Sequence, residues 1–352
     1  EILKVLYRGA RILIFDEPTA VLVPQEVDDL FNALKGLRAE GMAIIFISHK
    51  LDEVLRVADD VTVVRAGLTV AQVKSKDVTA RQLAELMVGS ELPQPTTHGD
   101  TRRPEVTLSL KDVSVPTKSG SRDLISHISF DLQAGEVIGI AGVEGNGQAE
   151  LVEAIMGLRE YTGQVEFKGK NIDHYSVAHR HDAGIGLIPE DRQRQALMMN
   201  SPLWENRILG HQRSKPVMRG FILDKKATIA DTRVIMDEFD VRAPGPHTLA
   251  TALSGGNQQK FIVGREMSKA PALLVASHPT RGVDVGAQAA IWDELRSARE
   301  KGMAIVLISA DLEELIGMSD RLLVMLRGVI TAELNPQKTT PEQLGSAMTG
   351  AQ

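Results

Sequence analysis

LSGGNQQK, at residues 253–260, is the segment of this sequence that most strongly constrains its fold. Gly255 and Gly256 allow another backbone or a ligand to approach closely, and Ser254 can cap a helix that starts there. The exposed backbone N–H groups at a helix N-terminus favour an anion such as phosphate. The segment therefore predicts a helix with an anion-facing N-terminus; the alternative is an ordinary N-cap before an amphipathic helix.

Length and composition narrow the classes of protein. The 352 residues suffice for one large domain and part of another, and a net charge of −6 gives no reason to expect nucleic acid as the main partner. The chain has no cysteine, which excludes disulfides and thiolate metal sites. Its longest apolar runs fall far short of the roughly 20 residues that span a bilayer. We therefore expect any membrane contact to be made through a partner protein.

An internal repeat organises the chain. Residues 11–89 align without a gap on residues 272–350, at an offset of 261 set by the Pro-Thr pairs at 18–19 and 279–280. The segment GMAI recurs in the same register, at 41–44 and 302–305. By this offset the counterpart of LSGGNQQK would precede the first residue. We therefore expect the chain to be the C-terminal part of a tandem protein whose opening residues are absent.

Each copy has the pattern of an α/β fold. In the first copy, an apolar run at 12–15 predicts a buried strand, and apolar residues at helical spacing over 27–37 predict a helix. A second strand at 42–47, a short helix at 51–57 and a third strand at 61–64 follow. Such alternation favours a mainly parallel sheet, in which ligands bind at the carboxyl ends of the strands.

The segment ELPQPTTHGDTRRPE at 91–105 interrupts every periodicity and carries Pro, Gly and charge, so it is the predicted linker. The expected domains are residues 1–90 and 106–352. Within the second, residues 191–251 lack strand alternation and contain helical pieces. The part at 199–209 is a candidate docking surface for a partner; the alternative is a helical insertion that packs into its own core.

Acidic residues close the first predicted strand, in ILIFDEPT at 12–19. A carboxylate at the carboxyl end of a buried strand can hold Mg²⁺, usually through water, which suits Asp16. Its neighbour Glu17 can orient or deprotonate an attacking water. His49 ends the next strand, which would lie alongside in a parallel sheet. The alternatives are a solvated acidic turn and a surface histidine.

A phosphate-binding loop is predicted in the second copy, but it is degenerate. GVEGNGQA at 142–149 keeps the glycine spacing of G-x-x-x-x-G-K-[ST], while Gln148 replaces the lysine and Ala149 the hydroxyl. These losses remove the ammonium and the Mg²⁺ ligand on which phosphoryl transfer depends. Ser277 and His278 stand where the first copy has its two carboxylates, and Ala310 stands opposite His49.

These motifs resemble those of ABC-type ATPase cassettes. LSGGNQQK resembles the signature motif, which in that family contacts the γ-phosphate of ATP held by a partner cassette, and residues 12–17 resemble the Walker B motif. The resemblance implies an α/β P-loop NTPase fold: a cassette with a parallel-sheet core, an antiparallel β part and a helical subdomain, preceded by the C-terminal part of a second cassette.

The family resemblance also assigns roles and cofactors. ATP and Mg²⁺ are the implied cofactors, with Asp16 on the metal side, Glu17 as catalytic base and His49 as the switch that senses the γ-phosphate. The implied ATP-binding residues are Ser254, Gly255 and Gly256 of the signature, and Gly142, Gly145, Asn146, Gly147 and Gln148 of the degenerate loop. One composite site would join the carboxylates of the first copy to the signature of the second and would hydrolyse ATP. The other would be inert or a weak nucleotide holder.

Over essentially the whole chain, the sequence resembles the double-cassette ATP-binding subunit of a bacterial importer of monosaccharides and nucleosides. FDEPTAVLVPQE and GVEGNGQAEL are more similar to the nucleoside branch. The resemblance implies transmembrane permease subunits and a solute-binding protein as partners, and a peripheral location on the cytoplasmic face of the inner membrane. Two other hypotheses stay open. One is a soluble tandem ABC ATPase acting on ribosomes or DNA; the other is a catalytically inert fragment, since no complete site lies within the chain.

Overall fold

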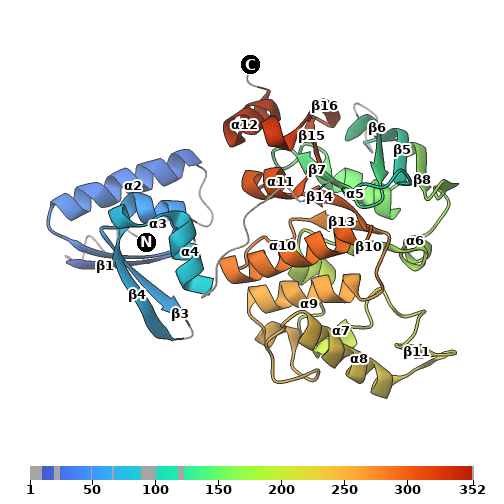
Figure 1. Cartoon of the computed structure of the whole chain (residues 1–352), viewed down its shortest axis with the longest axis horizontal. Coiled ribbons are helices and arrows are strands. Elements are labelled where there is room, and N and C mark those ends of the chain that lie inside the picture. The colour runs from blue at the N-terminus through green and yellow to red at the C-terminus, as the bar shows by residue number, and fades with distance from the viewer. Residues whose placement is uncertain are drawn as a thin grey trace. The chain divides into compact units, whose positions relative to one another are not determined.

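The computed structural model describes residues 10–19, 24–48, 50–65, 67–88, 99, 101–117 and 123–350. The chain divides into two compact units, one of residues 1–94 with 284–289 and the other of residues 95–283 with 290–352. In Figure 1 residues 1–94 are mainly blue, and the second unit runs from green to red. Each unit is described by itself.

The first unit is a small α/β arrangement. Its elements are β1 (Ile12–Asp16), α2 (Pro24–Ala39), β2 (Ala43–Ile47), α3 (Leu51–Val57), β3 (Asp60–Arg65), β4 (Leu68–Lys74) and α4 (Ala80–Val88). Strands β1 and β2 pair in parallel, whereas β3 and β4 form an antiparallel hairpin. The strands and helices predicted here are confirmed. Their apolar residues form a core built around Leu13, Phe15, Phe31 and Leu34.

The second unit contains a six-stranded sheet in the order β10-β13-β14-β7-β15-β16. Its strands are β7 (Val137–Ala141), β10 (Ile185–Ile188), β13 (Leu273–Ser277), β14 (Ala304–Ile308), β15 (Arg321–Leu326) and β16 (Val329–Leu334). All are parallel except the edge strand β16. Every residue of β7, β13 and β14 is buried, as expected for parallel strands covered on both faces.

A second, antiparallel sheet has the order β6-β5-β8-β9. It comprises β5 (Val106–Val115), β6 (Ile125–Gln133), β8 (Thr162–Phe167) and β9 (Lys170–Asn171). The helices are α5 (Gln148–Met156), α6 (Val177–Ala183), α7 (Leu203–Asn206), α8 (Lys225–Glu238), α9 (Gly255–Met267), α10 (Val285–Glu300), α11 (Leu312–Met318) and α12 (Pro341–Thr349). Figure 1 shows β5, β6 and β8 at one end of this unit and α7 and α8 at the other.

Two hydrophobic clusters cover the large sheet. One contains residues of α9 to α12, such as Phe261, Leu295 and Leu344, and the other joins α5 to the antiparallel sheet through residues such as Leu151 and Leu110. A parallel sheet with an antiparallel β part and a helical part was the expected architecture. The region 191–251 also holds a π-helical turn (Arg192–Ala196) and a hairpin of two-residue strands, β11 (Met218–Arg219) and β12 (Ile222–Leu223), which were not predicted.

The segment at 199–209, for which a docking surface and a helical insertion were the two expectations, has its central side chains buried. Trp204 is 9% exposed and Asn206 is fully buried. The Asn206 side chain accepts a hydrogen bond from the Met198 backbone N–H at 2.7 Å and donates to the Met198 and Ser201 carbonyls. The segment therefore packs into its own core, as the alternative interpretation predicted.

The offset of 261 residues aligns the secondary structure as well as the sequence. The pairs β1/β13, α2/α10, β2/β14, α3/α11, β3/β15 and α4/α12 begin and end at positions 261 residues apart. The ion pair between Arg38 and Asp59, at 2.7 Å, recurs between Arg299 and Asp320 at 2.6 Å. The first unit thus has the same succession of elements as residues 273–349 of the second.

One face of the first unit is exposed where the second unit is covered. Ile14 and Ile45 are 67% and 50% exposed, while their counterparts Val275 and Val306 are fully buried. Strands β2 and β3 border a groove of about 1020 Å³ with a mostly apolar lining. In the second unit, β7 lies between their counterparts β14 and β15 and pairs with both.

Among the described residues, no helix combines the length and the apolar composition required to cross a bilayer.

Candidate functional site

The acidic pair of the first unit lies where it was predicted, in the turn after β1. Asp16 ends the strand in register with Ile47 of β2, and both Asp16 and Glu17 are exposed. Glu17 has a positive φ of 46°, and its backbone N–H donates to the Ile47 carbonyl at 2.8 Å. The ends of the two strands are therefore held side by side. His49, the third predicted residue of this site, lies outside the described residues.

The signature segment starts a helix, as predicted. Ser254 is the N-cap of α9, and its side chain accepts hydrogen bonds from the Asn257 backbone N–H and side-chain amide. Ser254 itself is exposed, Gly255 is half-buried and Gly256 is buried. The three residues thus form the start of a 13-residue helix, where backbone N–H groups and the helix dipole favour an anion.

Arg192 fixes the start of α9 against the loop that follows β13. Its guanidinium donates to the Arg281 and Gly282 carbonyls at 2.6 and 3.1 Å and to Gln258 Oε1 of α9 at 3.3 Å. A Cβ at Gly255 would lie 2.6 Å from Arg192 Nη2 and 2.9 Å from the Gly282 carbonyl oxygen. Packing therefore favours glycine at 255, since one of these two neighbours is backbone.

We expect Gly255→Ala to destabilise the protein by about 1–3 kcal/mol, since the added methyl overpacks a junction bounded by backbone. Gly345→Ala is the matched control, because this glycine lies inside α12 and its nearest neighbour to a new Cβ is 4.0 Å away. That variant should be neutral or more stable by about 0.5–1 kcal/mol. Urea unfolding of both variants measures the difference. Equal stability changes would contradict the packing account.

The degenerate loop between β7 and α5 brings together all five residues predicted for it, and its polar side chains bond back onto the protein. The amide of Gln148 donates to the Val143 carbonyl at 3.2 Å and lies over Gly142, where a Cβ would come within 2.4 Å of Nε2. Asn146 Oδ1 accepts from the Arg327 backbone N–H at 2.9 Å. Gly145 and Gly147 have positive φ values of 88° and 111°. The loop therefore keeps glycines with positive φ, although Gln148 stands at the position of the lysine.

The strand end in the second unit has no carboxylate. Ser277 ends β13, and His278 follows with φ 49°, the conformation of Glu17. Nδ1 of His278 accepts a hydrogen bond from the Ala310 backbone N–H at 3.3 Å. Burial lowers the pKa of His278, so the ring is neutral near pH 7. His278 therefore holds two loops together rather than a metal ion.

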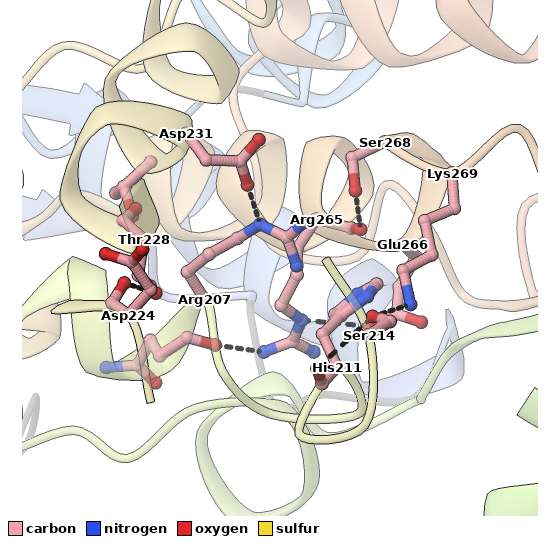
Figure 2. Close-up of polar contacts among 12 residues, drawn as sticks. Arg207, His211, Ser214, Asp224, Thr228, Asp231, Arg265, Glu266, Ser268 and Lys269 are labelled. Carbon is pink, nitrogen blue, oxygen red and sulfur yellow. Dashed lines mark hydrogen bonds and ion pairs between the residues drawn. The ribbon is translucent and has the colours of Figure 1, made fainter. Parts of the chain in front are cut away.

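Sequence reasoning missed one buried polar cluster, formed by His181, His211 and Glu266. It is the only group of three potential metal ligands within the described part of the chain. Figure 2 shows Arg207, Arg265 and Lys269 gathered around His211 and Glu266. Burial, and then the charge of Arg207, lower the pKa of His211 to about 2. The positive charges of Arg207, Arg265 and Lys269 around the cluster disfavour a metal cation, so we interpret the cluster as structural. The residues come from three separate elements, and no spacing in the sequence signals them.

The buried His211 predicts a specific pH dependence of stability. Between pH 6.5 and pH 2 the unfolded chain binds a proton at this position that the folded chain does not, so the free energy of unfolding falls as the pH falls below 6.5. From pH 7 to pH 5 the contribution is about 2 kcal/mol. We expect His211→Leu to remove this difference between pH 7 and pH 5 in the free energy of unfolding, measured with urea at both pH values. His174→Gln, at an exposed position, should leave the difference unchanged. An unchanged pH dependence in His211→Leu would contradict the prediction.

Comparisons with known proteins place the chain among related sequences. Residues 125–281 match the family model described as ABC transporter. The chain is 42% identical to the nucleoside import ATP-binding protein NupA of Lactococcus lactis over 351 residues, which are 99% of this chain and 69% of NupA. It is 43% identical to the guanosine import ATP-binding protein NupO of Bacillus subtilis over 352 residues, 100% of this chain and 69% of NupO.

A protein of sugar import has the same sequence identity to this chain as NupA. The glucose import ATP-binding protein TsgD13 of Haloferax volcanii is 42% identical over 353 residues, 99% of this chain and 64% of TsgD13. Among solved structures, a nucleotide-free ATP-binding cassette from an ABC transporter superposes with a TM-score of 0.57 at 21% identity. It covers 69% of this chain and 95% of that one, and it supports the cassette fold.

Proposed function

The chain belongs to the ABC transporter family, among the ATP-binding subunits of nucleoside and sugar importers, and we propose that its two units serve one competent and one degenerate ATP site. ATP binding and ATPase activity are properties of this family. The single observation that carries the proposal is the contrast between equivalent strand ends. Asp16 ends β1 and Glu17 follows it, whereas Ser277 ends β13 and His278 follows it with nearly the same φ as Glu17.

The first unit is, in this proposal, the C-terminal part of an ABC cassette. Its elements have counterparts at a constant offset in the second unit, and its exposed groove lies between β2 and β3, where the second unit has β7 between β14 and β15. A strand such as β7, followed by a phosphate loop, fits that groove. The printed sequence contains no G-x-x-x-x-G-K-[ST] segment, so this loop would come from polypeptide outside the 352 residues.

The competent site would combine that phosphate loop with residues of both units. Oxygen donors at the end of β1 fit Mg²⁺, which neutralises charge on the phosphates when it is bound, and Asp16 would hold it through water. Glu17 would orient and deprotonate the attacking water, and His49 would contact the γ-phosphate. Ser254, Gly255 and Gly256 would close the site with backbone N–H groups at the start of α9.

The second site would not hydrolyse ATP. Its loop offers the neutral amide of Gln148 in place of an ammonium, and that amide is already bonded to the Val143 carbonyl. Glu144 adds a negative charge within the loop. His278 is bonded to the Ala310 backbone, and the strand before it ends in Ser277 rather than in a carboxylate. Without metal ligand, base or lysine, the remaining backbone geometry supports at most weak nucleotide binding.

We propose nucleoside import as the process that this ATPase energises. Support comes from the names of two relatives, nucleoside for NupA and guanosine for NupO, and from the motifs at 15–26 and 142–151. Permease subunits and a solute-binding protein would be its partners, and this subunit itself would lie peripherally on the cytoplasmic face of a bacterial inner membrane. The alternative is import of a simple sugar, which the equal similarity to TsgD13 supports.

The experiment that tests this function is reconstitution. The subunit, its permease and its solute-binding protein are placed in proteoliposomes, and ATP hydrolysis and uptake are measured with guanosine or with glucose. We expect guanosine to stimulate both, and glucose to stimulate neither. Stimulation by glucose alone would assign the sugar branch. ATP hydrolysis with no dependence on a permease would reject the importer role.

A further inference from the structure

A buried hydrogen bond ties the turn that carries Glu17 to the helix after β2. Thr19 Oγ1 donates to Glu53 Oε2 at 2.6 Å, and Thr19 is only 2% exposed. Glu53 lies in the first turn of α3, where its other oxygen is paired with Lys50 at 3.2 Å. The bond therefore joins the loop at the end of β1 to the segment that follows the end of β2.

The second unit contains the same bond at the same offset. Thr280 Oγ1 donates to Glu314 Oε1 at 2.8 Å, and this oxygen also accepts from Trp292 Nε1 at 2.7 Å. The two turns agree in other respects. The Glu17 and His278 backbone N–H groups donate to the Ile47 and Ile308 carbonyls, at 2.8 and 2.7 Å. The threonine–glutamate bond is thus retained even where the carboxylates of the turn have been replaced.

The turn needs such an anchor because of its backbone. A positive φ at a residue other than glycine is disfavoured and persists only where surrounding contacts enforce it. Glu17 has φ 46°, with an anchor at its own N–H and a second at Thr19, two residues later. These two contacts bracket the residue. They set the direction in which its exposed side chain leaves the sheet.

We propose that Thr19 and Glu53 are positioning residues for ATP hydrolysis. They hold the turn in the conformation from which the Glu17 carboxylate reaches the attacking water, and they touch neither nucleotide nor water themselves. This inference rests on the proposed function, in which Glu17 activates water. General-base catalysis requires the base within hydrogen-bond reach of the water, and a displacement of about 1 Å can lower the rate about 100-fold.

The internal repeat supplies a matched control for the experiment. Thr19→Val and Thr280→Val each remove the same hydroxyl from equivalent bonds, one beside the catalytic pair and the other beside Ser277 and His278. In the full transporter complex, we expect Thr19→Val to lower kcat for ATP about 10- to 100-fold, with KM for ATP within about twofold. Thr280→Val should leave kcat within about twofold, although both variants lower the Tm. Thr19→Ser, which keeps the donor, should restore kcat to within about threefold of wild type.

Two results would overturn the inference. One is an equal loss of kcat in Thr19→Val and Thr280→Val, which would mean that both bonds only stabilise the fold. The other is a wild-type kcat in a folded Thr19→Val. If Thr19→Val fails to fold, Glu53→Gln takes its place, because it keeps an acceptor oxygen and should lose less kcat than Glu53→Ala. Glu17→Gln distinguishes failure of the proposed function from failure of the positioning role. ATP hydrolysis by Glu17→Gln would reject the proposed function. An inactive Glu17→Gln together with a wild-type kcat in Thr19→Val would reject only the positioning role.

Discussion

Glu17→Gln is expected to lower ATP hydrolysis by the assembled transporter by about 10²- to 10⁴-fold, the range lost with a general base. The substitution keeps the size of the side chain and its capacity to accept a hydrogen bond, but it removes the group that takes the proton. His278→Ala, at the equivalent position of the second unit, should change the rate by no more than about threefold, because His278 is bonded to the Ala310 backbone and the strand before it ends in Ser277 rather than in a carboxylate.

The measurement is the steady-state release of phosphate by purified complexes with equal subunit content. Nucleotide binding provides the control, because Glu17→Gln should still bind ATP while failing to hydrolyse it. Equal losses in the two variants would refute the division into one competent and one degenerate site. An active Glu17→Gln would place the base elsewhere.

The second large effect concerns the 352 residues purified on their own. We expect their rate of ATP hydrolysis to be at least about 10³-fold below that of the transporter, because oxyanion and phosphate stabilisation alone accounts for factors of that size. The lysine that contacts the phosphates is absent from the loop at 142–149, and the Gln148 amide occupies the loop instead.

Phosphate release at saturating ATP and Mg²⁺, together with a thermal unfolding curve to show that the chain is folded, tests this expectation. Rapid hydrolysis that disappears in the Glu17→Gln variant would contradict it, because it would show that these residues contain a complete site. Rapid hydrolysis that survives in that variant would indicate a contaminating ATPase.

The sequence was sufficient for the main elements because several signals agreed. Apolar runs marked the buried strands, and the repeat doubled the information on every element from β1 to β3. The start of α9 was predictable from a serine before two glycines, a local pattern with a local cause. The turn at Glu17 was located, but its left-handed backbone was not, because glutamate has no preference for that conformation.

Long-range contacts were beyond the sequence. The bonds of Arg192 to the loop after β13 connect residues about 90 positions apart. The cluster of His181, His211 and Glu266 draws on three elements with no common spacing. The segment at 199–209 could not be assigned from the sequence because tryptophan and asparagine occur both in interfaces and in cores, and only packing distinguishes the two. The roles of Asp16, Glu17 and His49 remain predictions.

The exposed face of the first unit has a consequence for handling the protein. Within the described residues, β2 pairs only with β1, and β3 only with β4, so each presents one edge of unpaired backbone groups. Open edges beside exposed isoleucines are templates for strand addition between molecules. The 352-residue polypeptide, purified without its partners, will therefore tend to aggregate. It will stay monodisperse longer at low protein concentration.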